Sequence, residues 1–143
     1  MAKPDPALLD PARYPFSCPI PTRYGDLDPN RHINNVALIG MLEDARLRLH
    51  HACKPGSTFR DWPIMTVSFA LEYLGQGYYP EPVTVAGAFT RIGRSSFQMA
   101  QAAFQQGRPI AYADTVLVWV EGDRPVAVPD TFRSALQTYM IRA

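Results

Sequence analysis

The sequence has 143 residues, of which 47% are apolar and 19% are charged, and its formal net charge is +1. This length suits one ordinary domain with one substantial core, and the composition excludes a chain that is disordered throughout. The near-zero charge and the lack of a basic stripe argue against nucleic acid as a partner.

Two cysteines, Cys18 and Cys53, lie far apart in the sequence and form neither a CxxC pair nor a zinc-type spacing. We expect free thiols in a reducing compartment, with one disulfide between them as the alternative, and no metal site. The proline-rich start, "MAKPDPALLDPARYPF", lacks the apolar segment of a signal peptide, and no apolar run approaches the roughly 20 residues of a membrane span. A cytoplasmic location without a membrane partner is therefore the default expectation.

Prolines interrupt residues 1–16, which we expect to form an N-terminal tail on the surface ahead of a single domain over residues 17–143. A short extended segment is expected at residues 17–24. Residues 34–52 contain good helix formers and no proline, which predicts a long helix. Its first turns, residues 36–42, are apolar on every side and are therefore expected to be buried all round.

Four segments after this helix have the alternation and the residue types of strands, and short turns separate the last three. They cover residues 63–74, 83–92, 95–106 and 110–120. One face of the first is expected to carry Met65, Val67, Phe69, Leu71 and Tyr73. Residues 130–140 predict a terminal helix with Asp130 as its cap. The order predicts an α+β fold in which a curved antiparallel sheet of about five strands wraps one long helix.

Small side chains recur on these strands, and they let a helix or another backbone approach the sheet closely. They are Ala86, Gly87, Ala88, Ala100, Ala102, Ala103, Ala111 and Ala113. A sheet of four or five strands also leaves an edge, which favours pairing with a second copy.

The stretch at the start of the long helix, "RYGDLDPNRHINN" from Arg23 to Asn35, contains two carboxylates, a histidine and an Asn-Asn pair. It resembles the motif R-[YF]-x-D-x-D-x-x-G-H-[VI]-N-N of the hotdog-fold acyl-CoA thioesterases, in their 4-hydroxybenzoyl-CoA thioesterase-like branch. The helix then carries Glu43, Ala45 and Arg46 in the family's E-x-A-R pattern.

Two later segments also resemble this family. The closing segment "RPVAVPDTFRSAL" (124–136) is similar to the one in which a proline precedes the family's last helix, and "RIGRSS" (91–96) resembles its R-[IV]-G-x-S-S turn. The turn is expected to bind the coenzyme A arm, with an ordinary hairpin turn as the alternative. The residues expected to do so are Arg91, Gly93, Arg94, Ser95 and Ser96. The resemblance covers about residues 17–135 and implies the hotdog fold, a curved sheet around a central helix.

The resemblance implies that Asp28 is the catalytic carboxylate, as a general base or as a nucleophile, and that the backbone N–H of Asn35 binds the thioester oxygen. His32 would act with them, Asn34 would bind substrate, and Asp26 would hold the loop backbone. Asn34 or Asn35 is also the expected N-cap of the helix. A carboxylate beside a helix N-terminus suits thioester hydrolysis, because free N–H groups and the helix dipole stabilise negative charge on the carbonyl oxygen.

Glu43 is a second candidate for the carboxylate, because another hotdog branch places a catalytic glutamate on the helix. Its alternative role is an i,i+3 partner of Arg46. Two positions depart from the family pattern: Arg31 stands where a glycine is usual, and Leu38 where an aromatic residue is common. Both departures bear on the acyl group more than on the fold.

Hydrolysis of an acyl-CoA thioester to a free acid and coenzyme A is the favoured function, in a homodimer or a dimer of dimers. Coenzyme A is then part of the substrate, and no metal or other cofactor is expected. An acyl-carrier-protein thioesterase is one alternative, although the near-neutral charge does not favour an acidic partner. The other is a hotdog module that binds acyl-CoA without hydrolysing it; Asp28 argues against this, because binding alone needs no carboxylate at the carbonyl. The pattern leaves the acyl group open.

Overall fold

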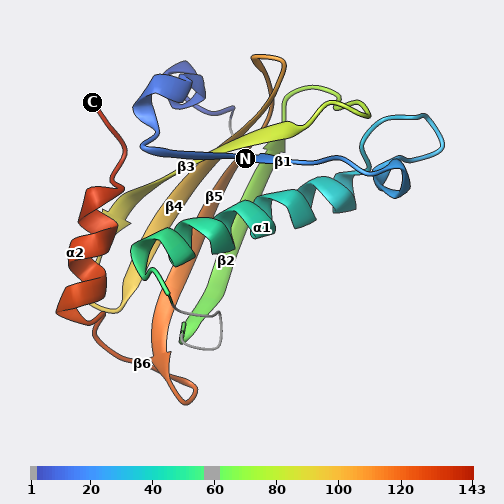
Figure 1. Ribbon diagram of the computed structural model, residues 1–143. Helices are drawn as coiled ribbons and strands as arrows, with labels where there is room; N and C mark the ends of the chain where they lie inside the picture. The colour runs from blue at the N-terminus through green and yellow to red at the C-terminus, as the bar shows by residue number, and fades with distance from the viewer. Residues whose placement is uncertain (1–2, 57–61) are drawn as a thin grey trace.

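The protein is α+β, and its elements follow one another largely as the sequence predicts (Figure 1). The computed structural model describes residues 3–56 and 62–143. The strands are β1 (Phe16–Ile20), β2 (Ile64–Tyr73), β3 (Val83–Ile92), β4 (Ser96–Gln105), β5 (Arg108–Glu121) and β6 (Arg124–Pro125). The helices are α1 (Asn35–Cys53) and α2 (Asp130–Thr138), and short 3-10 turns are η1 (Pro6–Leu9), η2 (Pro11–Arg13) and η3 (Tyr24–Asp26). The predicted helices, and the four strands predicted between them, are confirmed to within two residues at each end.

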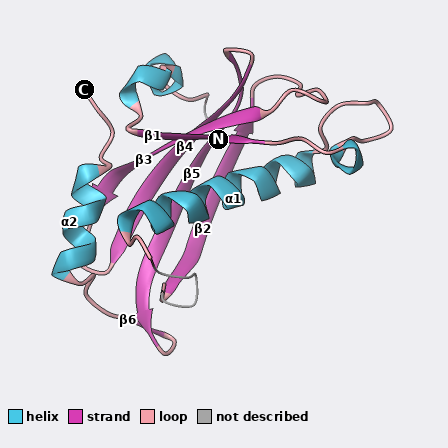
Figure 2. Cartoon of the chain, in the orientation of Figure 1, coloured by secondary structure: helices cyan, strands magenta, loops and turns pink. Residues whose placement is uncertain are grey.

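One antiparallel sheet forms the body of the protein, in the order β1-β3-β4-β5-β2, with β6 paired to β5. The long helix α1 lies across one face of this sheet (Figure 2). A Cβ atom at Gly87 would lie only 3.2 Å from Leu49 Cδ2, so glycine at this point of β3 lets the helix come close. The sheet therefore wraps α1 as predicted, with β1 and β2 as its two edges.

The helix α1 has one covered and one uncovered face. Leu42 and Leu49 are fully buried against the sheet, whereas Val36 is 75% exposed and Leu47 is 39% exposed. The prediction that residues 36–42 are buried all round is therefore wrong. The physical reason is that a single sheet covers one side of a helix, so that the other side of this apolar segment stays uncovered within one chain.

The edge strand β2 is the least buried strand of the main sheet. None of its ten residues is buried, and Met65 and Val67 are 47% and 57% exposed. A bulge between Thr66 and Ser68 shifts the register, so that Met65 no longer shares the face of Phe69. The prediction of one continuous apolar face along this strand is wrong at the bulge.

Residues near the N-terminus pack on the sheet face away from α1. Tyr14 is buried there, and its hydroxyl donates to the backbone oxygen of Leu8 at 2.7 Å. Small side chains make room for it, and these are Ala86, Ala88, Ala100 and Ala102. The backbone N–H of Arg142 donates to Arg13 O at 2.8 Å, so the C-terminal segment lies beside the 3-10 turn η2.

Smaller expectations have mixed outcomes. The N-cap of α2 is Pro129, so the prediction of Asp130 as the cap is wrong by one position, although its carboxylate lies in the first turn. Cys18 and Cys53 are free thiols, as expected. Within residues 3–56 and 62–143, no helix is long and apolar enough to cross a membrane.

Candidate active site

The loop that precedes α1 is held by Asp26. Its carboxylate accepts from the backbone N–H of Arg23 at 2.8 Å and from Arg23 Nη2 at 2.9 Å, and the residue is only 5% exposed. Burial alone would raise the pKa of Asp26, but the hydrogen bonds and the charge of Arg23 outweigh it and lower the pKa. Asp26 therefore holds the loop backbone, in keeping with the role that the sequence suggests.

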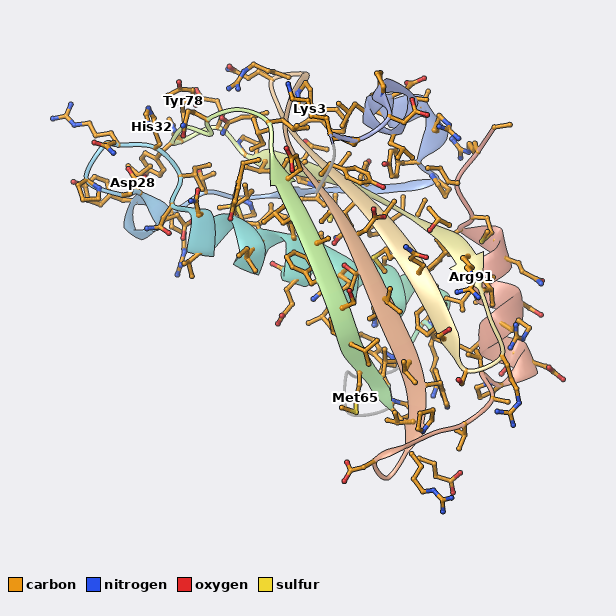
Figure 3. The ribbon with its side chains drawn as sticks, turned by 180° about the vertical axis from the view of Figure 1, so that it is seen from behind. Lys3, Asp28, His32, Met65, Tyr78 and Arg91 are labelled. Carbon is orange, nitrogen blue, oxygen red and sulfur yellow. The ribbon has the colours of Figure 1, made fainter. Side chains whose placement is uncertain are left out.

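Asp28 lies at the far side of this loop, half-buried, near His32 and Tyr78 (Figure 3). Its Oδ1 atom accepts from the backbone N–H groups of Asn30 at 2.9 Å and of His32 at 3.2 Å, and its own N–H donates to His32 O at 2.9 Å. Within the described part of the chain, no hydrogen bond engages Oδ2. One carboxylate oxygen thus fixes the turn, and the other is left for a ligand or a water molecule.

Arg31 has a φ angle of 65° and so adopts the left-handed conformation. Side chains other than glycine adopt this conformation at a cost of roughly 1–2 kcal/mol. The geometry explains why the resembling motif has glycine here: the turn between Asp28 and His32 requires it. In this chain the turn forms around an exposed arginine instead.

The start of α1 offers free N–H groups. The Asn34 side chain caps the helix by accepting from Val36 N at 2.8 Å, which confirms Asn34 as the N-cap. Asn35, the first helical residue, is exposed, and its backbone N–H has no hydrogen-bond partner among the described residues. The Tyr73 hydroxyl donates to Asn35 O at 3.3 Å, which ties the end of β2 to this helix start.

The loop after β2 closes the site from the other side. Ile33 N donates to Gly77 O at 2.9 Å, and a Cβ atom at Gly77 would come within 2.7 Å of Ile33 Cδ1. The His32 ring meets the Tyr78 ring edge-on, with centroids 5.4 Å apart. Buried Gln105 holds this loop, since Tyr78 N donates to its Oε1 at 2.8 Å and its Nε2 donates to Tyr78 O.

Gly77, Tyr78 and Gln105, which hold the loop opposite Asp28, were not predicted from the sequence. The break "GQGYYPEP" indicated a loop, but nothing in it showed that Gly77 and Tyr78 meet the loop before α1. Gln105 lies next to the end of the strand predicted at residues 95–106, and nothing in the neighbouring sequence distinguishes it. Contacts between segments so far apart in the chain depend on the order of the strands in the sheet.

The turn between β3 and β4 is closed by backbone hydrogen bonds. Gly93 N donates to Ser96 O at 2.7 Å, and Trp119 N donates to Ser95 O at 2.8 Å. Arg94 O accepts from Val128 N and from Arg133 Nη2, each at 2.9 Å. These bonds leave the side chains of the turn available to a ligand.

Within one chain this turn is far from Asp28 (Figure 3). Ser96 and Met65 both pair with Val118 of β5, from its two sides, whereas Tyr73 pairs with Ala111 at the other end of that strand. The ten residues of β2 span about 30 Å. The structure therefore brings Asp28 and His32 into contact, and Asn34 and Asn35 follow them at the start of α1, whereas the turn residues Arg91, Gly93, Arg94, Ser95 and Ser96 lie apart from them.

Two pockets flank α1. The larger, of about 680 Å³, lies along the first turns of the helix and is bordered by Arg23, Asp26 and Asn34. The smaller, of about 290 Å³, is bordered by Glu43 and Arg46, whose side chains form an ion pair at 3.6 Å. Asp28 lines neither pocket. Glu43 thus has the ion-pair partner that its alternative role predicts.

The sequence model of the thioesterase-like superfamily matches residues 22–136, so the chain belongs to this superfamily. The resemblance to hotdog thioesterases and the hotdog fold are confirmed. Two similar solved structures are a thioesterase from Thermus thermophilus complexed with coenzyme A and Zn, and a predicted thioesterase from Bacillus stearothermophilus. Both are 28% identical, with TM-scores of 0.81 and 0.82, and the matches cover 87% and 90% of this chain and 93% and 98% of those chains.

A mutant of 4-hydroxybenzoyl CoA thioesterase complexed with 4-hydroxybenzoyl CoA is also similar, with a TM-score of 0.76 over 87% of this chain and 99% of that chain. At 16% identity, this likeness shows the shared fold alone. A search of curated protein sequences gave no match.

Proposed function

We propose that the protein hydrolyses an acyl-CoA thioester, with Asp28 as the carboxylate that activates water. The observation that carries this proposal is the pairing of two unused groups. Asp28 Oδ2 and the Asn35 N–H both lack partners among the described residues; Asp28 belongs to the loop that precedes α1, and Asn35 is the first residue of that helix. A carbonyl bound to that N–H would have a carboxylate on one side and the helix dipole behind it.

The chemistry follows from these two groups. The Asn35 N–H donates to the thioester oxygen, and the Asp28 carboxylate takes a proton from water as the water oxygen bonds to the carbonyl carbon. When the tetrahedral intermediate collapses, the carbon–sulfur bond breaks and Asp28 returns the proton to the leaving thiolate of coenzyme A. The products are the free acid and coenzyme A, and no redox partner is needed.

The proposed enzyme is a homodimer that pairs two β2 edges. Three observations support this: among the described residues β2 has no strand partner on its outer side, none of its ten residues is buried, and Leu47, on the uncovered side of α1, borders a pocket with the first residues of β2. Antiparallel pairing about a two-fold axis sets the Tyr73 end of one strand beside the Ile64 end of the other. The turn at Arg94 in one copy then lies at the Asp28 end of the second copy. Such a dimer brings together the loop with Asp28 and the turn with Arg94, which lie about 30 Å apart within one chain. A dimer of dimers would contain the same shared site twice over.

The test is a panel of acyl-CoA and acyl-carrier-protein thioesters with detection of free thiol. It compares the unchanged protein with Asp28→Asn and with Asp123→Asn, a matched change of an exposed residue in the turn that joins β5 to β6. We expect acyl-CoA hydrolysis that only Asp28→Asn abolishes. Full activity in Asp28→Asn would remove Asp28 from the chemistry and favour Glu43. Faster hydrolysis of the acyl-carrier-protein thioesters would mean that the substrate is attached to that protein rather than to coenzyme A. Binding of acyl-CoA without release of thiol would mean that the protein binds its ligand without hydrolysing it.

A further inference from the structure

The smaller pocket beside α1 has an apolar wall and a polar wall. The apolar wall comes from Leu47, Ile64 and Leu117, and the polar wall from Glu43, Arg46 and His50 on the helix. Its volume of about 290 Å³ is enough for a small acyl group. It is separate from the loop that carries Asp28.

Two buried polar atoms on the polar wall lack a hydrogen-bond partner within the described residues. They are Arg46 Nη1 and His50 Nε2, on residues that are only 7% and 2% exposed. The residues are four apart on α1, so their side chains lie on the same face of the helix, one turn apart. A buried polar group that has lost its water and gained no partner carries an energetic cost. One ligand oxygen between the two side chains would relieve both costs.

The charge of the pocket indicates which oxygen fits. Glu43 Oε2 lies 3.6 Å from Arg46 Nη2 and already balances the guanidinium. Burial, aided by the charge of Arg46, lowers the pKa of His50 to about 3, so its ring is neutral near pH 7. A carboxylate would add an uncompensated charge to this site, whereas a neutral oxygen would add none. The pocket therefore suits a hydroxyl or keto oxygen better than a carboxylate.

The place of the pocket connects it to the reaction. Ile64 and Thr66, at the start of β2, line it. In the proposed dimer this end of β2 lies beside the Tyr73 end of the second copy, where the Tyr73 hydroxyl contacts Asn35 at the start of α1. An acyl group whose thioester is bound at one helix start can thus extend into the pocket of the other chain.

We propose, on the basis of the proposed function, that this pocket holds the acyl group, and that Arg46 and His50 select acyl groups that carry a hydroxyl or keto oxygen. The selection consists of hydrogen bonds from Arg46 Nη1 and His50 Nε2–H to that oxygen. One of these bonds comes from the charged guanidinium and one from the neutral imidazole, and together they give an expected preference of roughly tenfold or more over the unsubstituted acyl group.

The experiment measures kcat/KM for acyl-CoA thioesters of one chain length: unsubstituted, hydroxylated at successive carbons, and carrying a terminal carboxylate. His50→Phe keeps an aromatic ring beside Phe89 and Phe97, whose centroids lie 6.4 and 6.1 Å from that of His50, and removes the nitrogen atoms. His50→Gln restores an Nε2 donor. His51→Phe, at the exposed neighbouring position, is the matched control.

The proposal expects one hydroxylated thioester to be preferred by roughly tenfold, the preference to vanish in His50→Phe, and a partial return in His50→Gln. The control should keep the full preference. Hydrolysis without any preference, a preference unchanged by His50→Phe, or a stronger preference for the carboxylate would overturn it. Calorimetric binding of the free acids gives a second measurement that needs no turnover. If no thioester is hydrolysed but the hydroxy acid still binds selectively through His50, the proposed function fails and the pocket assignment stands.

Discussion

The two faces of α1 differ in what they contact, although both are apolar. One face is buried in the sheet through residues such as Leu42, which is 0% exposed. The other carries Val36 and Leu47 into solvent, and Leu47 borders a pocket with Ile64 and Thr66 of the edge strand β2. The comparison separates two functions of one helix. The covered face stabilises the chain, and in the proposed dimer the uncovered face would stabilise the contact between copies on which the proposed site depends.

The largest expected effect on the unfolding of the chain comes from a matched pair of leucines. Leu42→Ala removes fully buried methyl groups and should lower the free energy of unfolding by about 2–5 kcal/mol. Leu47→Ala, five residues along the same helix and 39% exposed, should lower it by less than about 1 kcal/mol. Urea denaturation of both variants at protein concentrations low enough to give monomers checks this. Equal losses of unfolding free energy in the two variants would show that both faces of α1 stabilise the single chain to the same extent.

A charge on the edge of β2 should act on assembly rather than on the fold. Val67→Lys places a cation where two β2 strands would meet, and we expect the dissociation constant of the dimer to rise at least about tenfold. Thr84→Lys, at an exposed position of the inner strand β3, is the control and should leave assembly unchanged. Sedimentation equilibrium measures the dissociation constant. A Val67→Lys protein that dimerises as before would place the contact elsewhere.

Loss of the helix cap should have a moderate effect. Asn34→Ala leaves Val36 N without its side-chain acceptor and should lower the free energy of unfolding by about 1 kcal/mol. The same change should lower kcat, because the capped helix start positions the Asn35 N–H. Asn34→Ser, which keeps an acceptor oxygen, should recover most of both losses. Thermal denaturation and steady-state kinetics measure the two effects. An Asn34→Ala protein with unchanged stability and unchanged kcat would contradict the prediction.

The smallest expected effect has the opposite sign. Arg31→Gly relieves the left-handed backbone at φ 65° and should raise the free energy of unfolding by up to about 1 kcal/mol. Thermal denaturation checks this. Gln106→Gly, at the other described non-glycine position with a positive φ, gives a comparison outside the loop. A loss of stability in Arg31→Gly would mean that the arginine side chain stabilises the turn in a way that outweighs its strain.

Much of the fold could be predicted because local patterns determine it. The strand alternation placed β3 at its observed bounds, and helix formers bounded by asparagine and by "KPGS" placed α1. The motif placed Asp28 in the loop that precedes this helix. The uncovered face of α1 could not be predicted, because composition shows that a face is apolar but not which neighbour covers it. The bulge at Val67 was likewise invisible, since one extra residue reverses the alternation without leaving a pattern.

The second pocket was missed for a different reason. His50 ends a helix in the sequence, where a histidine is ordinarily exposed and interacts with the helix dipole. In the structure it is packed among aromatic rings, and burial rather than the dipole determines its charge. Arg46 was recognised in the E-x-A-R pattern and as an ion-pair partner of Glu43, but not as part of a pocket. The free Nη1 atom depends on the side-chain geometry, which the sequence does not contain.

The central claim is that two chains form one site, with the carboxylate from one copy and the turn between β3 and β4 from the other. Mixing inactive variants tests it most directly: Asp28→Asn protein is combined in equal amounts with Arg91→Ala/Arg94→Ala protein, after dissociation and reassociation. Random pairing makes half of the dimers mixed, and each mixed dimer contains one intact site, so about a quarter of the unchanged activity should return. A mixture no more active than its two components would contradict the shared site.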